Sequence, residues 1–160
     1  MKSLVVFYSL TNKTKLVAET IAEALAAELL EIKETEIRKP GGLLHLKGGF
    51  EALKNKESKI APIQTDLNQY DKVFIGSPIW ASRPTPAINS FIKINNFWGI
   101  DVVPFFTMAG NNSNKALKNI TAKIGKSSGK VIGSFAIKSH RLTDEEIKSM
   151  AKETVKHYSA

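Results

Sequence analysis

The sequence predicts a doubly wound α/β fold, in which helices cover both faces of a parallel five-stranded sheet. Short apolar runs, typical of strands buried on both faces, alternate along the chain with amphipathic segments of helical period. Right-handed crossovers between parallel strands place the intervening helices on both faces of such a sheet. With 160 residues, 42% of them hydrophobic, the chain suits a single domain over residues 1–160.

The first part of the chain carries a central strand, a helix and an irregular stretch. Residues 3–8 are a continuous apolar run, and apolar residues then recur at helical spacing until about Leu29. Leu30, Ile32 and Ile37 alternate with polar residues, which is typical of a strand nearer the sheet edge. Residues 39–62 are rich in leucine and glycine, and connections of this length are commonly binding loops or mobile segments.

The rest of the chain continues the alternation. The expected strands are residues 71–76, 102–108 and 131–137, and the expected helices are 84–92, 114–124 and 143–158. Pro104 has no N–H to donate to a sheet, so we expect it where its strand begins. Thr143 and Glu146 have the spacing of a capping box, which predicts the start of the last helix. We expect Trp98 to serve in packing.

The composition excludes several kinds of chemistry. The chain has no cysteine, which excludes disulfides, thiolate metal sites and cysteine nucleophiles, so any redox reaction needs a bound cofactor. The three histidines have no spacing or acidic cluster that predicts a metal site, and no catalytic side chain is predicted. The opening apolar run is too short for a signal peptide, and no later run reaches membrane-spanning length. We therefore expect a cytoplasmic protein without membrane insertion.

The net charge is strongly positive. Lysine and arginine outnumber acidic residues 23 to 15, for a formal charge of +8. The lysines are spread along the chain without aromatic interleaving or a recognisable nucleic-acid module, which favours an ordinary solvated surface over nucleic-acid binding. The same charge would favour acidic redox partners, with rates that fall as salt rises.

The loop after the first strand has the composition of a phosphate receptor. In an open parallel sheet, ligands bind beyond the carboxyl ends of the strands, where the winding direction reverses. This loop consists of Ser9, Leu10, Thr11, Asn12, Lys13 and Thr14, and it offers hydroxyls and a lysine where the first helix begins. The alternative is that Thr11 or Thr14 only caps the helix, which would explain one hydroxyl. The loop is neither a Walker motif nor a dinucleotide-binding glycine turn.

Two further loops would lie at the same edge. The loop after the third strand contains Pro78, Ile79, Trp80 and Ala81, and a planar ligand could stack on the indole, although a core tryptophan is the alternative. The loop after the fourth strand contains Thr107, Met108, Ala109 and Gly110, which are small enough for close approach, although an ordinary turn would look the same. Together the three loops predict a mononucleotide with a ring system larger than nicotinamide.

Three stretches carry a family resemblance. Residues 5–18, 46–53 and 70–81 resemble, in this order, a flavodoxin-like FMN-binding family with a Leu/Gly-rich insertion before the third strand. The resemblance implies strand order 2-1-3-4-5 and FMN as the cofactor. It implies that Ser9, Thr11, Asn12, Lys13 and Thr14 hold the FMN phosphate, that residues 78–81 line the ring, and that residues 107–110 complete its other edge. The family usually has glycine where this chain has Asn12, but asparagine tolerates a left-handed backbone.

The function that the resemblance implies is electron transfer by bound FMN. One alternative is an FMN-dependent NAD(P)H:quinone-type oxidoreductase, and another is a domain that keeps the fold but has lost FMN. The expected partner is a redox protein or a small-molecule electron acceptor. Met108 or residues 43–50 could cover the second ring face, and residues 41–50 could equally form a homodimer contact.

Overall fold

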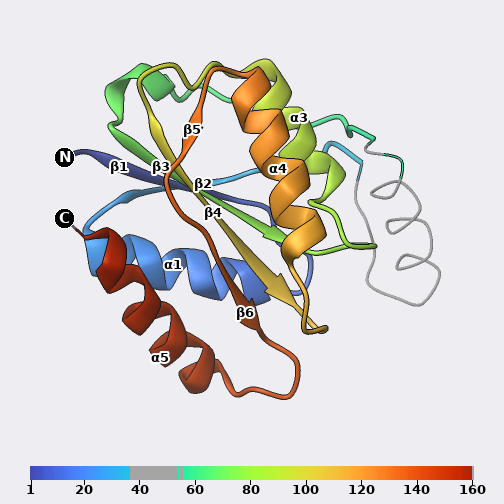
Figure 1. Ribbon diagram of the computed structural model, residues 1–160, viewed down its shortest axis with the longest axis vertical. Helices are drawn as coiled ribbons and strands as arrows, with labels where there is room; N and C mark the ends of the chain where they lie inside the picture. Colours follow the sequence, from blue (N-terminus) through green and yellow to red (C-terminus); the bar gives the residue numbers. More distant parts are fainter. Residues whose placement is uncertain (37–53, 55, 160) are drawn as a thin grey trace.

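The computed structural model describes residues 1–36, 54 and 56–159, which form a parallel sheet with helices on both faces (Figure 1). The strand order is β2-β1-β3-β4-β5, and β6 also pairs with β4. The strands are β1 Ser3–Phe7, β2 Glu28–Glu31, β3 Lys72–Pro78, β4 Asp101–Met108, β5 Lys130–Val131 and β6 Phe135–Lys138. Every pairing between them is parallel. The predicted doubly wound fold and its strand order are therefore confirmed.

Within the described part of the chain, four helices cover the sheet. The first and last, α1 (Lys13–Leu25) and α5 (Asp144–Val155), lie on one face, while α3 (Pro86–Ile94) and α4 (Asn114–Lys126) lie on the other (Figure 1). Short 3₁₀ turns occur at Leu67–Gln69 and Lys156–Tyr158. The capping box that opens α5 is confirmed, because Thr143 Oγ1 accepts from the Glu146 amide while the Glu146 carboxylate accepts from the Thr143 amide.

The core is divided into two layers by the sheet. Successive residues of β1 point to opposite faces, so Val5 and Phe7 pack with α1 and α5, whereas Leu4 and Val6 belong to the layer under α3 and α4. The central strands are buried on both sides, as their unbroken apolar runs predict. The edge strand β2 is more exposed, as its polar alternation indicates.

The first helix ends earlier than its sequence predicts. It stops at Leu25, because Ala26 has a left-handed backbone (φ 49) and its N–H bonds back to helical carbonyls. Strand β2 then begins at Glu28, and its Leu29 lies beside Val5 of β1. Residues 26–29 have good helix propensity, so pairing with β1 overrides the local preference here. The predicted end near Leu29 is wrong.

The predicted last strand is two strands, and this division explains Pro104. Both β5 and β6 pair with β4, but residues 132–134 separate them. The Val102 and Met108 carbonyls accept hydrogen bonds from the Ile132 and Ser139 amides, which directly follow β5 and β6. Every second residue of β4 therefore turns its backbone N and O atoms toward β5 and β6, and Pro104 is one of these residues. The proline nitrogen thus faces the interval between β5 and β6, where no ladder partner is lost. Pro104 lies inside β4 and not at its start, contrary to expectation.

Two other expectations concern surface segments. Trp98 is 78% exposed, so the expectation that it packs is wrong; its neighbour Phe97 is fully buried and fills the core position. Most of the leucine- and glycine-rich stretch falls in residues 37–53, which lie outside the described residues, as do its suggested roles as ring cover or dimer contact. None of the helices within the described ranges is long and apolar enough to cross a membrane.

Candidate functional site

The three predicted loops meet at the carboxyl ends of β1, β3 and β4. A hydrogen bond of 2.7 Å between the buried hydroxyls of Thr14 and Thr107 joins the first loop to the third. The Ile79 amide donates to the Thr107 carbonyl at 3.0 Å and joins the second loop to the third. The Tyr8 and Trp80 rings meet edge to face, with centroids 5.9 Å apart, where the first loop leaves the sheet. The tertiary structure thus assembles one site from three separate segments.

The first loop presents the positive end of α1. Asn12 is the N-cap residue and has a left-handed backbone (φ 64). This is the conformation in which asparagine can replace the usual glycine. The Asn12 side chain makes no capping hydrogen bond, and the first turn contains no acidic residue. The amides of this turn therefore retain their capacity to bind an anion.

The hydroxyl groups of this loop do not cap the helix. The Thr14 hydroxyl instead forms a hydrogen bond with the Thr107 hydroxyl, and the N-cap residue is Asn12. Thr14 therefore does not cap the helix. Since each hydroxyl has one proton, one of this pair donates to the other, and the second proton remains available to a ligand. The Ser9 Oγ atom is buried and has no hydrogen-bond partner in the described part of the chain. An unsatisfied buried hydroxyl costs about 1–3 kcal/mol, which an anionic ligand oxygen would relieve.

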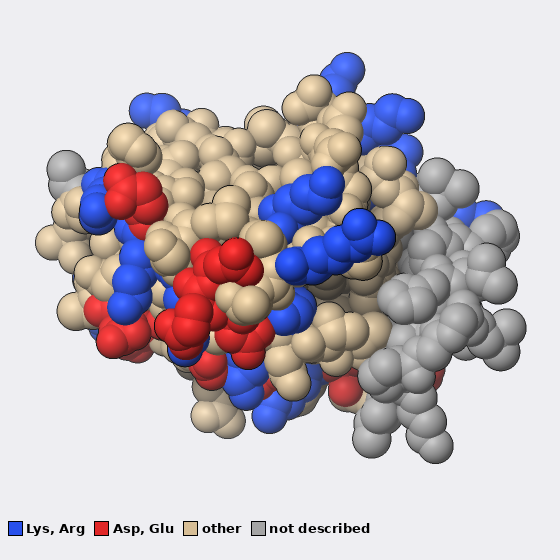
Figure 2. All heavy atoms as spheres, turned by 90° about the horizontal axis from the view of Figure 1, so that it is seen from below, with Lys and Arg blue, Asp and Glu red and all other residues tan. Residues whose placement is uncertain are grey.

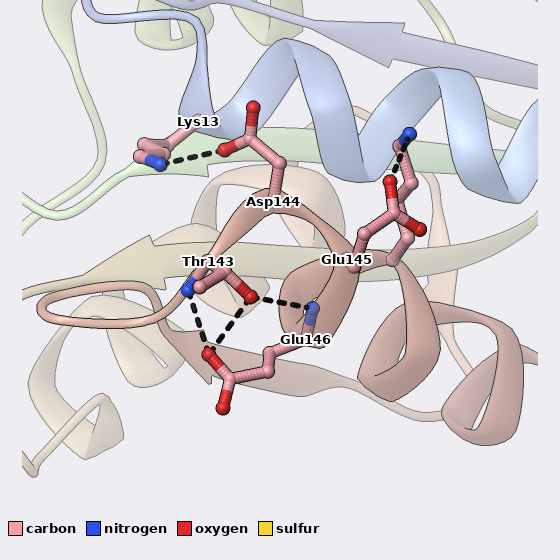
Figure 3. A network of polar contacts seen from close by, with 6 residues as sticks. Lys13, Thr143, Asp144, Glu145 and Glu146 are labelled. Carbon is pink, nitrogen blue, oxygen red and sulfur yellow. Dashed lines mark hydrogen bonds and ion pairs between the residues drawn. The ribbon is translucent and has the colours of Figure 1, made fainter.

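Lys13 is oriented by the last helix. Its Nζ lies 2.9 Å from Asp144 Oδ1 in the first turn of α5 (Figure 3). The hydrogen bond from Lys13 lowers the pKa of the Asp144 carboxyl, so this group is an anion at neutral pH. The two side chains line an open cavity of about 360 Å³ together with Thr11 and Asn12. Sequence reasoning missed Asp144, although the capping box already placed it at the start of α5.

The second loop is a tight turn with an uncommon backbone. Trp80 and Arg83 exchange two backbone hydrogen bonds of 3.0 Å, and between them Ala81 (φ 46) and Ser82 (φ 63) are both left-handed. Such turns normally use glycine or asparagine, and non-glycine residues in this conformation store strain that is typical of binding sites. Trp80 is half-buried, because it packs against the core layer under α3 and α4 and leaves part of its surface exposed.

The third loop is anchored on both sides. Thr107 is buried and Met108 half-buried, while Ala109 and Gly110 are exposed. The amide side chains of the next two residues hold the loop, because Asn111 accepts from Lys138 and Asn112 accepts from the Asn114 amide at the start of α4. A methyl group at Gly110 would meet no atom of the described residues within 4 Å, so there is space beside this loop.

Fold and site together define a doubly wound α/β protein with a mononucleotide-type site at the switch point of its sheet. The flavodoxin family profile matches residues 2–153. The chain therefore belongs to the flavodoxin family, which confirms the predicted family.

Several solved structures resemble this chain. A flavoprotein from Lactobacillus acidophilus NCFM, crystallised in complex with FMN, is 27% identical with a TM-score of 0.71, over 84% of this chain and 92% of that one. The NMR structure of its apo-form gives a TM-score of 0.64 at 27% identity, over 86% and 93% of the two chains. Oxidised Flavodoxin 2 from Bacillus cereus shares the fold at 16% identity, with a TM-score of 0.57 and 99% of both chains covered. A WrbA-like flavodoxin from Agrobacterium tumefaciens does so at 17% identity, with a TM-score of 0.60, over 99% of this chain and 96% of that one. No curated protein matches the sequence.

Proposed function

We propose that this flavodoxin binds one FMN at the carboxyl edge of its sheet and uses it to carry electrons. The observation that carries the proposal is the buried, unpartnered Ser9 hydroxyl beside the uncapped amino end of α1. A phosphate group supplies the acceptor oxygens that both features need. FMN is the cofactor indicated by the family match and by the FMN complex of the Lactobacillus relative.

The residues present fit FMN. Ser9, the amides that follow Asn12, and the Thr14 hydroxyl would hold the phosphate, with Lys13 adding positive charge at the rim. Trp80 and the left-handed turn after it would border the ring on one side, and Thr107 to Gly110 would border it on the other. When bound, FMN supplies the redox chemistry, while the protein binds it, orients it and limits its contact with water.

The site residues are sufficient for an electron carrier. Lys13 is the only ionisable side chain among the fourteen predicted site residues, and it already pairs with Asp144. A carrier needs no acid or base of its own, because the cofactor holds the electrons. Direct oxidation of NAD(P)H by the FMN-loaded protein, without a separate reductase, would identify the quinone-reductase alternative instead.

FMN titration tests the proposal. FMN fluorescence should be quenched when the protein is added, and Ser9→Ala should weaken binding about tenfold, because one hydrogen bond to a charged oxygen contributes about 1.5 kcal/mol. Ser149→Ala removes an exposed hydroxyl from α5 and serves as the matched control. If the unaltered protein does not quench FMN, the third alternative holds and the fold has lost its cofactor. If Ser9→Ala binds as tightly as the control, Ser9 does not contact the phosphate.

The partner and the location belong to the same proposal. We expect a redox protein or a small-molecule acceptor as the partner, without nucleic acid or membrane insertion, and the cytoplasm as the compartment. Fractionation of cells that express the protein, followed by immunodetection, measures the location directly.

A further inference from the structure

The lysines of this protein form ion pairs in some regions of the surface and not in others. On α1, α5 and the 3₁₀ turn after α5, lysines pair with carboxylates at 2.6–3.0 Å, as in Lys13–Asp144, Lys148–Glu145 and Lys156–Glu153. Figure 2 shows acidic side chains gathered on one face, with basic side chains beside them. In contrast, α4 contains four lysines and no acidic residue. Among the described residues, Lys115 and Lys118 have no ion-pair partner.

The unpaired lysines line a pocket beside the predicted flavin site. A cavity of about 420 Å³ lies between α4 and the turn that follows Trp80. Arg83, Lys115 and Lys118 contribute cationic side chains to its wall, Asn119 contributes an amide, and Ala81 and Ala122 leave room. Lys115, Lys118, Asn119 and Ala122 lie at positions i, i+3, i+4 and i+7 of α4, so they share one helix face. None of the described residues that line this cavity is acidic.

The local field supports an anionic ligand. Further along α4, the pKa of Lys123 is lowered mainly by burial, and Lys126, Arg83 and Lys93 lower it further, against a raising effect of Glu57. Arg83 of the pocket wall is thus close enough to Lys123 for the two cations to repel each other, although Glu57 has the larger effect on Lys123. Such an arrangement is relieved by an anion, and the cavity volume lies within the range of about 300–1,000 Å³ typical of small-molecule pockets.

We propose that this pocket binds the phosphate or carboxylate group of a small-molecule electron donor or acceptor. The inference rests on the proposed function, because Ala81 belongs both to the predicted FMN site and to the pocket wall. A ligand anchored by Arg83, Lys115 and Lys118 would therefore lie next to the flavin. Concavity and volume favour a small molecule over an acidic protein surface, which would need no pocket.

The electrostatic potential at this pocket can be tested by oxidising the photoreduced, FMN-loaded protein with small ions of opposite charge. Ferricyanide is a trianion and hexaammineruthenium(III) a trication; each takes one electron from the reduced flavin and exchanges no atoms with it. Lys115→Gln/Lys118→Gln should lower the second-order rate constant for ferricyanide about tenfold at low salt and raise that for the ruthenium complex. Lys148→Gln/Lys152→Gln removes the same charge from α5 and should change both rates much less. Equal effects of the two double variants would overturn the proposal.

Binding itself is tested without flavin. Inorganic pyrophosphate added to the FMN-free protein should shift the backbone amide resonances of Ala116, Asn119 and Ala122 in a saturable manner, and Lys115→Gln/Lys118→Gln should abolish these shifts. Shifts confined to Asn12–Thr14, or no shifts at all, would overturn the proposal that the pocket binds anions. A response of the ferricyanide rate alone would not rescue it, because the overall positive potential of the protein would then explain that response. Failure to bind FMN would refute the proposed function, while this titration still decides whether the pocket binds anions.

Discussion

Gly76 lies where β3 approaches the site, and Gly76→Ala should strongly destabilise the protein. A methyl group built at this position would lie 2.2 Å from Cζ of Phe105 and within 2.8 Å of both Cε atoms of that ring. Phe105 is fully buried on the neighbouring strand β4, and its ring stacks on Phe135 with centroids 5.6 Å apart. The ring therefore has no open space into which to move.

The size of the effect follows from these distances. Carbon atoms in contact lie about 3.5–4.0 Å apart, so the Phe105 ring or the β3 backbone would have to shift by more than about 1 Å. Overpacking of a dense core costs about 1–3 kcal/mol, and because the obstacle is a stacked ring we expect about 3 kcal/mol for Gly76→Ala. A shift of β3 would also displace the turn that holds Trp80.

Urea unfolding monitored by circular dichroism measures this loss. Gly125→Ala is the matched control, because a methyl group there meets no atom of the described residues within 4 Å and the position lies in α4. Alanine is favoured over glycine inside a helix, so Gly125→Ala should raise the free energy of unfolding by up to about 1 kcal/mol. Equal midpoints for Gly76→Ala and the unaltered protein would refute the packing argument, provided that the m-value is unchanged.

Three further predictions concern single side chains. Asn12→Ala should lower the free energy of unfolding by about 1 kcal/mol, because alanine tolerates a left-handed backbone less well than asparagine, whereas Asn12→Gly should not lower it. Urea unfolding of both variants measures this difference, and an equal loss of stability in both would contradict the prediction. Burial, together with the hydrogen bond to Glu28, raises the pKa of Tyr70 to about 12. As the pH rises, Tyr70 therefore loses its proton in the unfolded chain before it does so in the folded protein. The free energy of unfolding should fall as the pH rises from about 10 to 12, and Tyr70→Phe should reduce this fall. The same pH dependence of urea unfolding in Tyr70→Phe and the unaltered protein would count against this prediction. Asp144→Asn should tighten FMN binding about three- to tenfold by removing a negative charge near the phosphate loop, and Glu145→Gln should change it less in the same fluorescence titration.

Much of the candidate site was predictable because its parts are local in the sequence. The loop Ser9–Thr14 contains its hydroxyls, its lysine and its left-handed residue within six positions, and the end of a buried strand locates it at the ligand-binding edge. Trp80 is recognisable for the same reason. The contribution of Asp144 to the position of Lys13 was not predictable in this way, because the two residues are 131 positions apart and only the packing of α5 against α1 brings them together.

The sequence by itself determined the alternation of strands and helices, the capping box of α5 and the three loops that form the candidate site, because each of these depends on periodicity or on neighbouring residues. Tertiary structure decided where elements end and which side chains meet. Glu28 and Leu29 leave the predicted helix because β1 offers them a strand partner, and Pro104 fits inside β4 because β5 and β6 are interrupted beside it. The unpartnered Ser9 hydroxyl and the cationic pocket beside Trp80 likewise depend on segments brought together only by the fold. Local preferences amount to tenths of a kcal/mol per residue, and sheet pairing and burial outweigh them wherever the two disagree.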